Sequence, residues 1–123
     1  IQPQLLADAL HNVVAGAVSG QQAGRDVLAM EDRPHAIFCH NDAMACGLMG
    51  ELQRGGLRVP EDIAIAGFDD SGLAATHEPP ITTMRQPWDQ ISAQMVAVLL
   101  EVIAGASPRS VILDTELVVR ESA

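Results

Sequence analysis

The sequence has few basic residues and no long apolar run, and each shortage excludes a class of function. Seven Lys and Arg residues stand against 16 Asp and Glu, for a formal net charge of −9. Nucleic-acid affinity depends mainly on basic groups that neutralise phosphates, so this chain alone should not bind DNA. No apolar segment approaches the roughly 18 residues of a membrane span, and the chain contains no charged-then-apolar signal segment. We therefore expect a cytoplasmic protein without a membrane partner, and a chain that is a fragment of a longer one.

Motifs for catalysis, metal binding and nucleotide binding are also missing. Cys39 and Cys46 form no C-x-x-C pair, which favours reduced thiols over a disulfide. His40, Cys39 and Asp42 are the only local cluster of metal-ligand types, and adjacent strand residues face opposite ways, so joint ligation is awkward. Ser71 has no G-x-S-x-G context, and the glycines form no G-x-G-x-x-G or Walker pattern. The sequence predicts no enzyme, no metal site and no cofactor.

Apolar periodicity and turn residues predict alternating strands and helices. Helices are expected over 20–30 after a Ser19 cap, from Asn41 or Asp42 to Gly55, and from Pro87 to Gly105. Strands are expected over 36–39, buried on both faces, over 63–68 and over 81–85, with one helical turn at most in the loop 71–80. Residues 111–113 and 117–119 form two short strands or one interrupted strand. For residues 1–18 two readings stay open: a helix through Leu5, Leu6 and Leu10, or a strand at Val13–Val14.

This alternation, in a chain of 123 residues, predicts a single α/β unit with a doubly wound, mainly parallel sheet.

Polar residues follow three of the predicted strands, as His40–Asn41–Asp42, Asp69–Asp70 and Arg85–Gln86. The carboxyl ends of parallel strands open into one crevice, so these groups should converge. Carboxylates accept hydrogen bonds from hydroxyls, and amides donate and accept, which suits a sugar or similar polyol. Trp88 would supply a flat apolar wall. The alternative is that Asn41, Asp42 and Asp70 only cap helices or turns and that Trp88 is core.

Four ordered segments resemble the lactose-repressor-like (LacI/GalR) transcription regulators. They are AIFCHNDAMA at 36–45, GLRVPED through GFDD at 56–70, PITTMRQP at 80–87 and ELVVRES at 116–122. The resemblance implies part of an effector-binding core similar to periplasmic sugar-binding proteins, in which two α/β subdomains enclose a ligand. Residues 1–85 and about 110–123 would form the second subdomain, and about 86–109 would cross into the first.

The resemblance also implies roles for individual residues. The effector contacts would be Asn41, Asp69, Gln86 and Trp88, with Asp69 directed at the effector and Asp70 structural. The surface of a homodimer would include Met44, Leu48, Leu73 and His77. Ala15 aligns near a position where some members carry a ligand-stacking aromatic.

The implied partners are a small sugar-like effector and, through an N-terminal helix-turn-helix absent from this chain, operator DNA. The stretch 46–58 is similar to gluconate-type regulators, which adds sugar acids to the effectors considered. The alternative is a sugar-binding protein of a transport system with the same fold.

Overall fold

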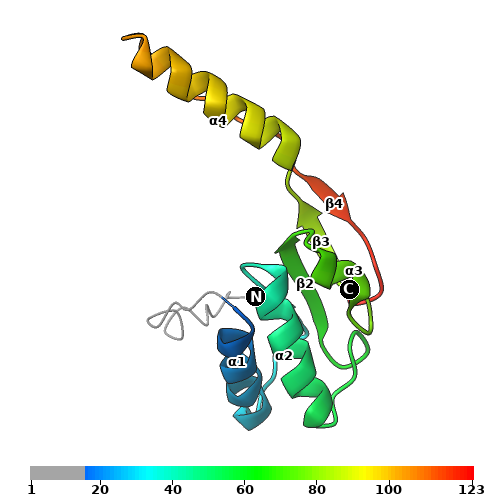
Figure 1. Cartoon of the computed structure of the whole chain (residues 1–123). Coiled ribbons are helices and arrows are strands. Elements are labelled where there is room, and N and C mark those ends of the chain that lie inside the picture. The colour runs from blue at the N-terminus through cyan, green and yellow to red at the C-terminus, as the bar shows by residue number, and fades with distance from the viewer. Residues whose placement is uncertain (1–15) are drawn as a thin grey trace.

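The computed structural model describes residues 16–123, and it consists of an α/β body with one long helix extending from it (Figure 1). In chain order the elements are α1 (Ala17–Ala29), β1 (Ala36–Phe38), α2 (Asp42–Arg54), β2 (Ala64–Asp69), α3 (Gly72–Thr76), β3 (Thr82–Arg85), α4 (Trp88–Ile103) and β4 (Glu116–Val118). The readings for Leu5, Leu6, Leu10, Val13–Val14 and Ala15 lie outside the described residues.

The sheet has four strands in the order β1-β2-β3-β4. β1, β2 and β3 are parallel, and β4 runs antiparallel to β3. The register sets Asp69 of β2 opposite Arg85 of β3, and Arg85 opposite Glu116 of β4. The prediction of an α/β fold with a mainly parallel sheet is confirmed.

One face of the sheet is covered by α2, and α1 packs on α2 (Figure 1). Leu48, Met49 and Leu52 of α2 are at most 1% exposed and meet Ile63 and Ile65 of the sheet region in one core. Each such side chain contributes roughly 1.5–3 kcal/mol through removal of apolar surface from water. This core holds the second half of α2 against the start of β2.

The opposite face of the sheet is not covered by α1 or α2. Phe38 pairs with Ala66, and Met84 pairs with Leu117, which places Phe38 and Leu117 on the same face. These two side chains are 63% and 58% exposed. The prediction that strand 36–39 is buried on both faces is therefore wrong, because the face of β1 that carries Phe38 lies open to solvent within residues 16–123.

Several predicted boundaries differ from the structure. α1 is capped by Gly16, so Ser19 lies inside the helix rather than at its cap. Residues 111–113 form no strand, and the one strand in this part of the chain is β4. α3 has five residues, which agrees with the single helical turn expected in the loop 71–80.

The segment 86–115, here named the α4 arm, leaves the sheet after β3 and returns to it at β4 (Figure 1). α4 starts after Pro87 and has no buried residue. Met95, Leu99 and Ile103 are 68%, 57% and 72% exposed. The returning chain lies beside the helix, since Arg109, Ser110 and Val111 line one groove with Ile91 and Met95.

Candidate functional site

Two predicted effector residues contact each other where β2 and β3 end. Asp69 is the last residue of β2, and Gln86 follows Arg85, the last residue of β3. Gln86 Nε2 donates a hydrogen bond to Oδ1 of Asp69 at 2.5 Å. Trp88 joins them, because its Nε1 donates to the backbone oxygen of Asp69 at 3.4 Å. The expected convergence of these two strand ends is present in the structure.

Trp88 is not a core residue. Its side chain is 52% exposed at the first turn of α4, so the alternative that assigned it to the core is wrong. An exposed indole beside polar groups offers an apolar face together with an N–H donor.

Asn41 is the N-cap of α2. Its Oδ1 accepts a hydrogen bond from the backbone N–H of Met44 at 2.8 Å, which confirms the predicted cap. Its Nδ2 amide donates to no group among residues 16–123, so the cap leaves this donor available. Asn41 makes no hydrogen bond with Asp69 or Gln86 in the described part of the chain.

Asp42 ties the start of α2 to the ends of β2 and β3. Its side chain is 1% exposed. Oδ1 accepts from Thr83 Oγ1 at 2.6 Å, and Oδ2 accepts from the backbone N–H of Ser71 at 2.6 Å. Thr83 Oγ1 also accepts from the backbone N–H of Asp70 at 3.4 Å. Asp42 is thus a structural group, as the capping alternative proposed for it.

Asp70 forms ion pairs with two arginines. Arg85 Nε donates to one carboxylate oxygen and Arg120 Nη2 to the other, each at 2.6 Å, and the Asp70 side chain is 9% exposed. Burial alone would raise the pKa of Asp70, but the hydrogen bonds and charges of Arg120 and Arg85 outweigh it and hold this pKa below its usual range. The assignment of Asp70 to a structural role agrees with these contacts.

The backbone turns sharply between these two aspartates. Asp69 has a φ of 105° and Asp70 a φ of 52°, a region that few residues other than Gly adopt. Such positions cost on the order of 1–3 kcal/mol each and persist where the surroundings hold them. Here the corner is held by the Asp70 ion pairs and by the Thr83 hydroxyl.

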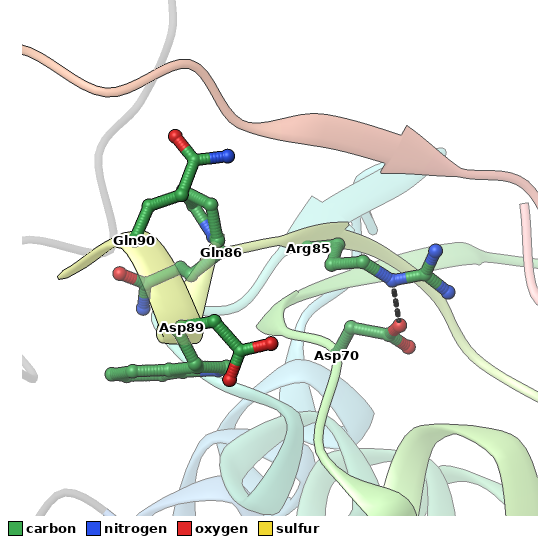
Figure 2. Close-up of a pocket in the computed structure, with 7 residues that line it drawn as sticks. Asp70, Arg85, Gln86, Asp89 and Gln90 are labelled. Carbon is green, nitrogen blue, oxygen red and sulfur yellow. Dashed lines mark hydrogen bonds and ion pairs between the residues drawn. The ribbon is translucent and has the colours of Figure 1, made fainter. Parts of the chain in front are cut away.

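An open pocket of about 350 Å³ lies beside this corner (Figure 2). Its lining residues are Asp70, Arg85, Gln86, Pro87, Trp88, Asp89 and Gln90. Figure 2 shows the Asp70–Arg85 pair on one side of it, with Gln86, Asp89 and Gln90 around the start of α4. Asn41 and Asp69 do not line this pocket. The described chain therefore offers an open wall for a ligand rather than an enclosed cavity.

Sequence reasoning missed Thr83 and Arg120. Arg120 donates to Asp70 and, through Nη1, to the backbone oxygen of Ile81 at 2.8 Å. It lies 50 residues after Asp70, so no local spacing connects them. The two threonines Thr82 and Thr83, in a predicted strand that also holds Ile81 and Met84, were the one available signal.

Between residues 16 and 123 no three His, Cys, Asp or Glu side chains are placed to hold a metal ion. Both cysteines are free thiols. Burial, with smaller effects from Cys46 and Asp42, raises the pKa of Cys39 to about 12, so this thiol stays protonated and unreactive at neutral pH.

The residues predicted for a dimer surface differ in accessibility. Leu73 is 52% exposed, and Met44 and His77 are half-buried. Leu48 is 1% exposed because α1 packs over this part of α2, so its side chain is not available to a second copy. The structure therefore removes Leu48 from the expected surface.

Comparison with known proteins identifies the family. The protein-family model described as a periplasmic binding protein-like domain matches residues 5–123 of the sequence. The chain belongs to this family.

The sequence relatives are regulators of transcription. The HTH-type transcriptional repressor PurR of Vibrio campbellii is 41% identical over an alignment of 102 positions that covers 81% of this chain and 30% of PurR. The repressor CytR of Escherichia coli K12 is 36% identical over an alignment of 124 positions that covers 99% of this chain and 35% of CytR. The chain spans about a third of the length of these relatives. They are named as repressors rather than enzymes, in agreement with the prediction of a non-catalytic chain.

Solved structures agree with the sequence relatives. The transcriptional regulator CelR–cellobiose complex superposes with a TM-score of 0.80 at 36% identity, over 88% of this chain and 34% of that chain. A LacI family regulator from Lactobacillus casei with bound sucrose superposes with a TM-score of 0.75 at 31% identity, over 88% of this chain and 41% of that chain. The resemblance to lactose-repressor-like regulators is confirmed. No helix between residues 16 and 123 combines the length and the apolarity that crossing a membrane requires.

Proposed function

We propose that the chain is the effector-binding and dimerisation part of a sugar-responsive, cytoplasmic transcription regulator of the LacI type. Asn41, Asp69, Gln86 and Trp88 contact a small sugar or sugar-acid effector. Operator DNA is bound only by a helix-turn-helix outside this chain, whose own net charge of −9 opposes nucleic acid. The observation that carries the proposal is the Asp69–Gln86 hydrogen bond beside the exposed Trp88, at the carboxyl ends of two parallel strands.

The free groups at this site suit a polyol. Gln86 Nε2 donates to Oδ1 of Asp69, so Oδ2 of Asp69 and the amide oxygen of Gln86 remain available as acceptors for a ligand. Asn41 adds an Nδ2 donor. Hydroxyls can satisfy both acceptors and the amide N–H donors, and Trp88 covers an apolar sugar face. The relatives with bound cellobiose and sucrose support this ligand class.

The exposed apolar residues of the α4 arm are an argument that the full-length protein has a second subdomain. Residues 1–85 and about 110–123 then form one subdomain, and about 86–109 belong to the other. A helix with Met95, Leu99 and Ile103 all more than half exposed gains free energy by packing on another part of the protein. The effector then binds between two bodies joined by the arm. Regulation follows if the effector has different affinities for two orientations of these bodies.

The experiment is calorimetric titration of the full-length protein with cellobiose, sucrose and glucose. Loss of a hydrogen bond to a charged group corresponds to roughly a ten- to hundredfold weaker Kd, so we expect that change for Asp69→Asn. Asp32→Asn is the matched control, because Asp32 is an exposed carboxylate before β1, away from the site. An unchanged Kd in Asp69→Asn would refute the assignment, and so would micromolar binding by the 123-residue chain alone, since that chain lacks the facing wall. A folded full-length protein that binds none of the three sugars refutes the sugar part of the proposal.

The dimer is tested separately. Met44, Leu73 and His77 remain in the proposed surface, and Leu73 is its most exposed member. A buried charge without a partner is costly, so Leu73→Glu should shift the full-length protein towards monomer in sedimentation velocity. An unchanged sedimentation coefficient at all concentrations contradicts this placement.

A further inference from the structure

The residues of the proposed effector site stand next in the sequence to members of one hydrogen-bond network, which is buried at Asp42 and Thr83. We name Asp42, Thr83, Asp70, Arg85 and Arg120 the corner network, after the hydrogen bonds that connect them. Asn41 precedes Asp42, Asp69 precedes Asp70, and Gln86 follows Arg85. The network therefore reaches the backbone of each polar site residue.

Thr83 occupies the centre of this network. Its side chain is 0% exposed, and its one oxygen makes two hydrogen bonds in opposite directions. It donates to Asp42 Oδ1 at 2.6 Å and accepts from the Asp70 backbone N–H at 3.4 Å. The first bond leads to the start of α2 and the second to the corner after β2. One further link runs in parallel, from the Ser71 N–H to Asp42 Oδ2.

These bonds act on backbone that does not hold its conformation alone. Asp69 and Asp70 have positive φ values, and the orientation of the Asp69 carboxylate follows from that corner. Asn41 is fixed by its cap at the other end of the same chain of bonds. Binding groups that are held in place before the ligand arrives lose less freedom on binding, which strengthens affinity.

We propose that Thr83 is a positioning residue for the effector. Its hydroxyl sets the spacing between Asn41 and Asp69, so that both reach one ligand. The inference rests on the proposed function, because it assigns a role at the same site. Thr83 itself does not touch the effector, since its side chain is fully buried.

The test compares two substitutions in the full-length protein. Thr83→Val keeps the shape of the side chain and removes the hydroxyl, whereas Thr83→Ser keeps the hydroxyl. With cellobiose, sucrose and glucose as probes, we expect Thr83→Val to bind about tenfold more weakly than the wild type and Thr83→Ser to restore most of the affinity. Equal affinity of Thr83→Val and wild type overturns the proposal, as does an equal loss in both variants.

A structural control separates positioning from general loss of stability. Val27→Ala removes fully buried apolar volume in α1, away from the site, and should lower the unfolding temperature without changing the Kd. If Val27→Ala weakens binding as much as Thr83→Val at a similar unfolding temperature, the role of Thr83 is only structural. Asp42→Asn alters the same hydrogen bond from its other end and replaces Thr83→Val if that variant does not fold.

A ligand-free measurement distinguishes this inference from the proposed function. In protein labelled with ¹⁵N-glutamine, the Gln86 side-chain amide reports its hydrogen bond to Asp69. We expect its resonances to shift in Thr83→Val and to stay in place in Thr83→Ser and Val27→Ala. Unshifted resonances in Thr83→Val refute positioning even where sugars bind. If no sugar binds and the resonances shift, the ligand class fails and the positioning stands.

Discussion

The close packing of α1 on α2 predicts opposite effects for two glycine substitutions in the same helix. An added Cβ on Gly47 would lie 2.0 Å from the backbone oxygen of Ala17. The nearest atom to an added Cβ on Gly50, one turn later, is the flexible end of Arg54 at 3.7 Å. Both positions are helical, so the intrinsic preference of a helix for Ala over Gly, about 1 kcal/mol, applies equally to both.

The magnitude follows from how far the helices must move. Ordinary van der Waals contact begins near 3.4 Å, so Gly47→Ala requires α1 to move by about 1.4 Å where it meets α2. The obstructing atom is backbone and cannot rotate away. Displacing α1 also opens the packing around Val27 and Leu48, which are 0% and 1% exposed. Overpacking costs about 1–3 kcal/mol and the loosened core adds to it, so after the gain in helix preference we expect a net loss of about 2 kcal/mol.

The assay is urea unfolding followed by far-ultraviolet circular dichroism, with thermal unfolding in parallel. Gly47→Ala should be about 2 kcal/mol less stable than the wild type, with an unfolding temperature lower by about 8 °C. Gly50→Ala should be up to about 1 kcal/mol more stable. A Gly47→Ala variant as stable as the wild type would refute the close approach of the two helices. Equal losses in both variants would show that α2 tolerates no alanine for a reason other than contact with α1.

Three further predictions concern the corner and the thiols. Asp70→Asn should lower stability by about 2 kcal/mol at pH 7, because it leaves Arg120 without its buried partner. Folding lowers the pKa of Asp70, so the wild type should lose this advantage over the variant as the pH falls below about 4. Urea unfolding of both proteins at pH 7 and pH 3 measures the two effects. Ser71→Ala should leave stability unchanged or raise it by up to about 1 kcal/mol in the same assay, since Ser71 Oγ is buried without a hydrogen-bond partner among residues 16–123. Iodoacetamide should modify half-buried Cys46 before buried Cys39 in the folded chain, as followed by mass spectrometry, and the reverse order contradicts the structure.

Local patterns predicted the parts of the fold that local chemistry determines. Asn41 before an apolar helical stripe signals an N-cap, and the cap is present. Asp69 and Gln86 come together because parallel strands end at the same edge of a sheet, which follows from the alternation of strands and helices. The bounds of α4 follow from Pro87 before it and Gly105 after it.

Other features depend on contacts that no local pattern contains. An apolar strand of three residues has the same sequence signature whether one or both faces of the sheet are covered, so the exposure of Phe38 could not be predicted. Ser19 suits a cap, but Gly16 starts the helix one turn earlier, where Gly20 and Gly47 let α1 approach α2. The Asp70–Arg120 pair joins residues 50 apart and depends on the antiparallel return of β4 beside β3.

The hydrogen-bond inventory of the corner also bears on the kind of effector. The groups left for a ligand are Oδ2 of Asp69, the amide oxygen and second N–H of Gln86, and the two N–H groups of Asn41 Nδ2, so acceptors and donors are both present. The two cations of this corner, Arg85 and Arg120, are both engaged by Asp70. A carboxylate on a sugar acid would therefore lie beside the Asp69 side chain without a free cation of the corner to pair with it. This half of the site favours the hydroxyls of a sugar, and any acid group of the effector must be bound by residues on the facing wall.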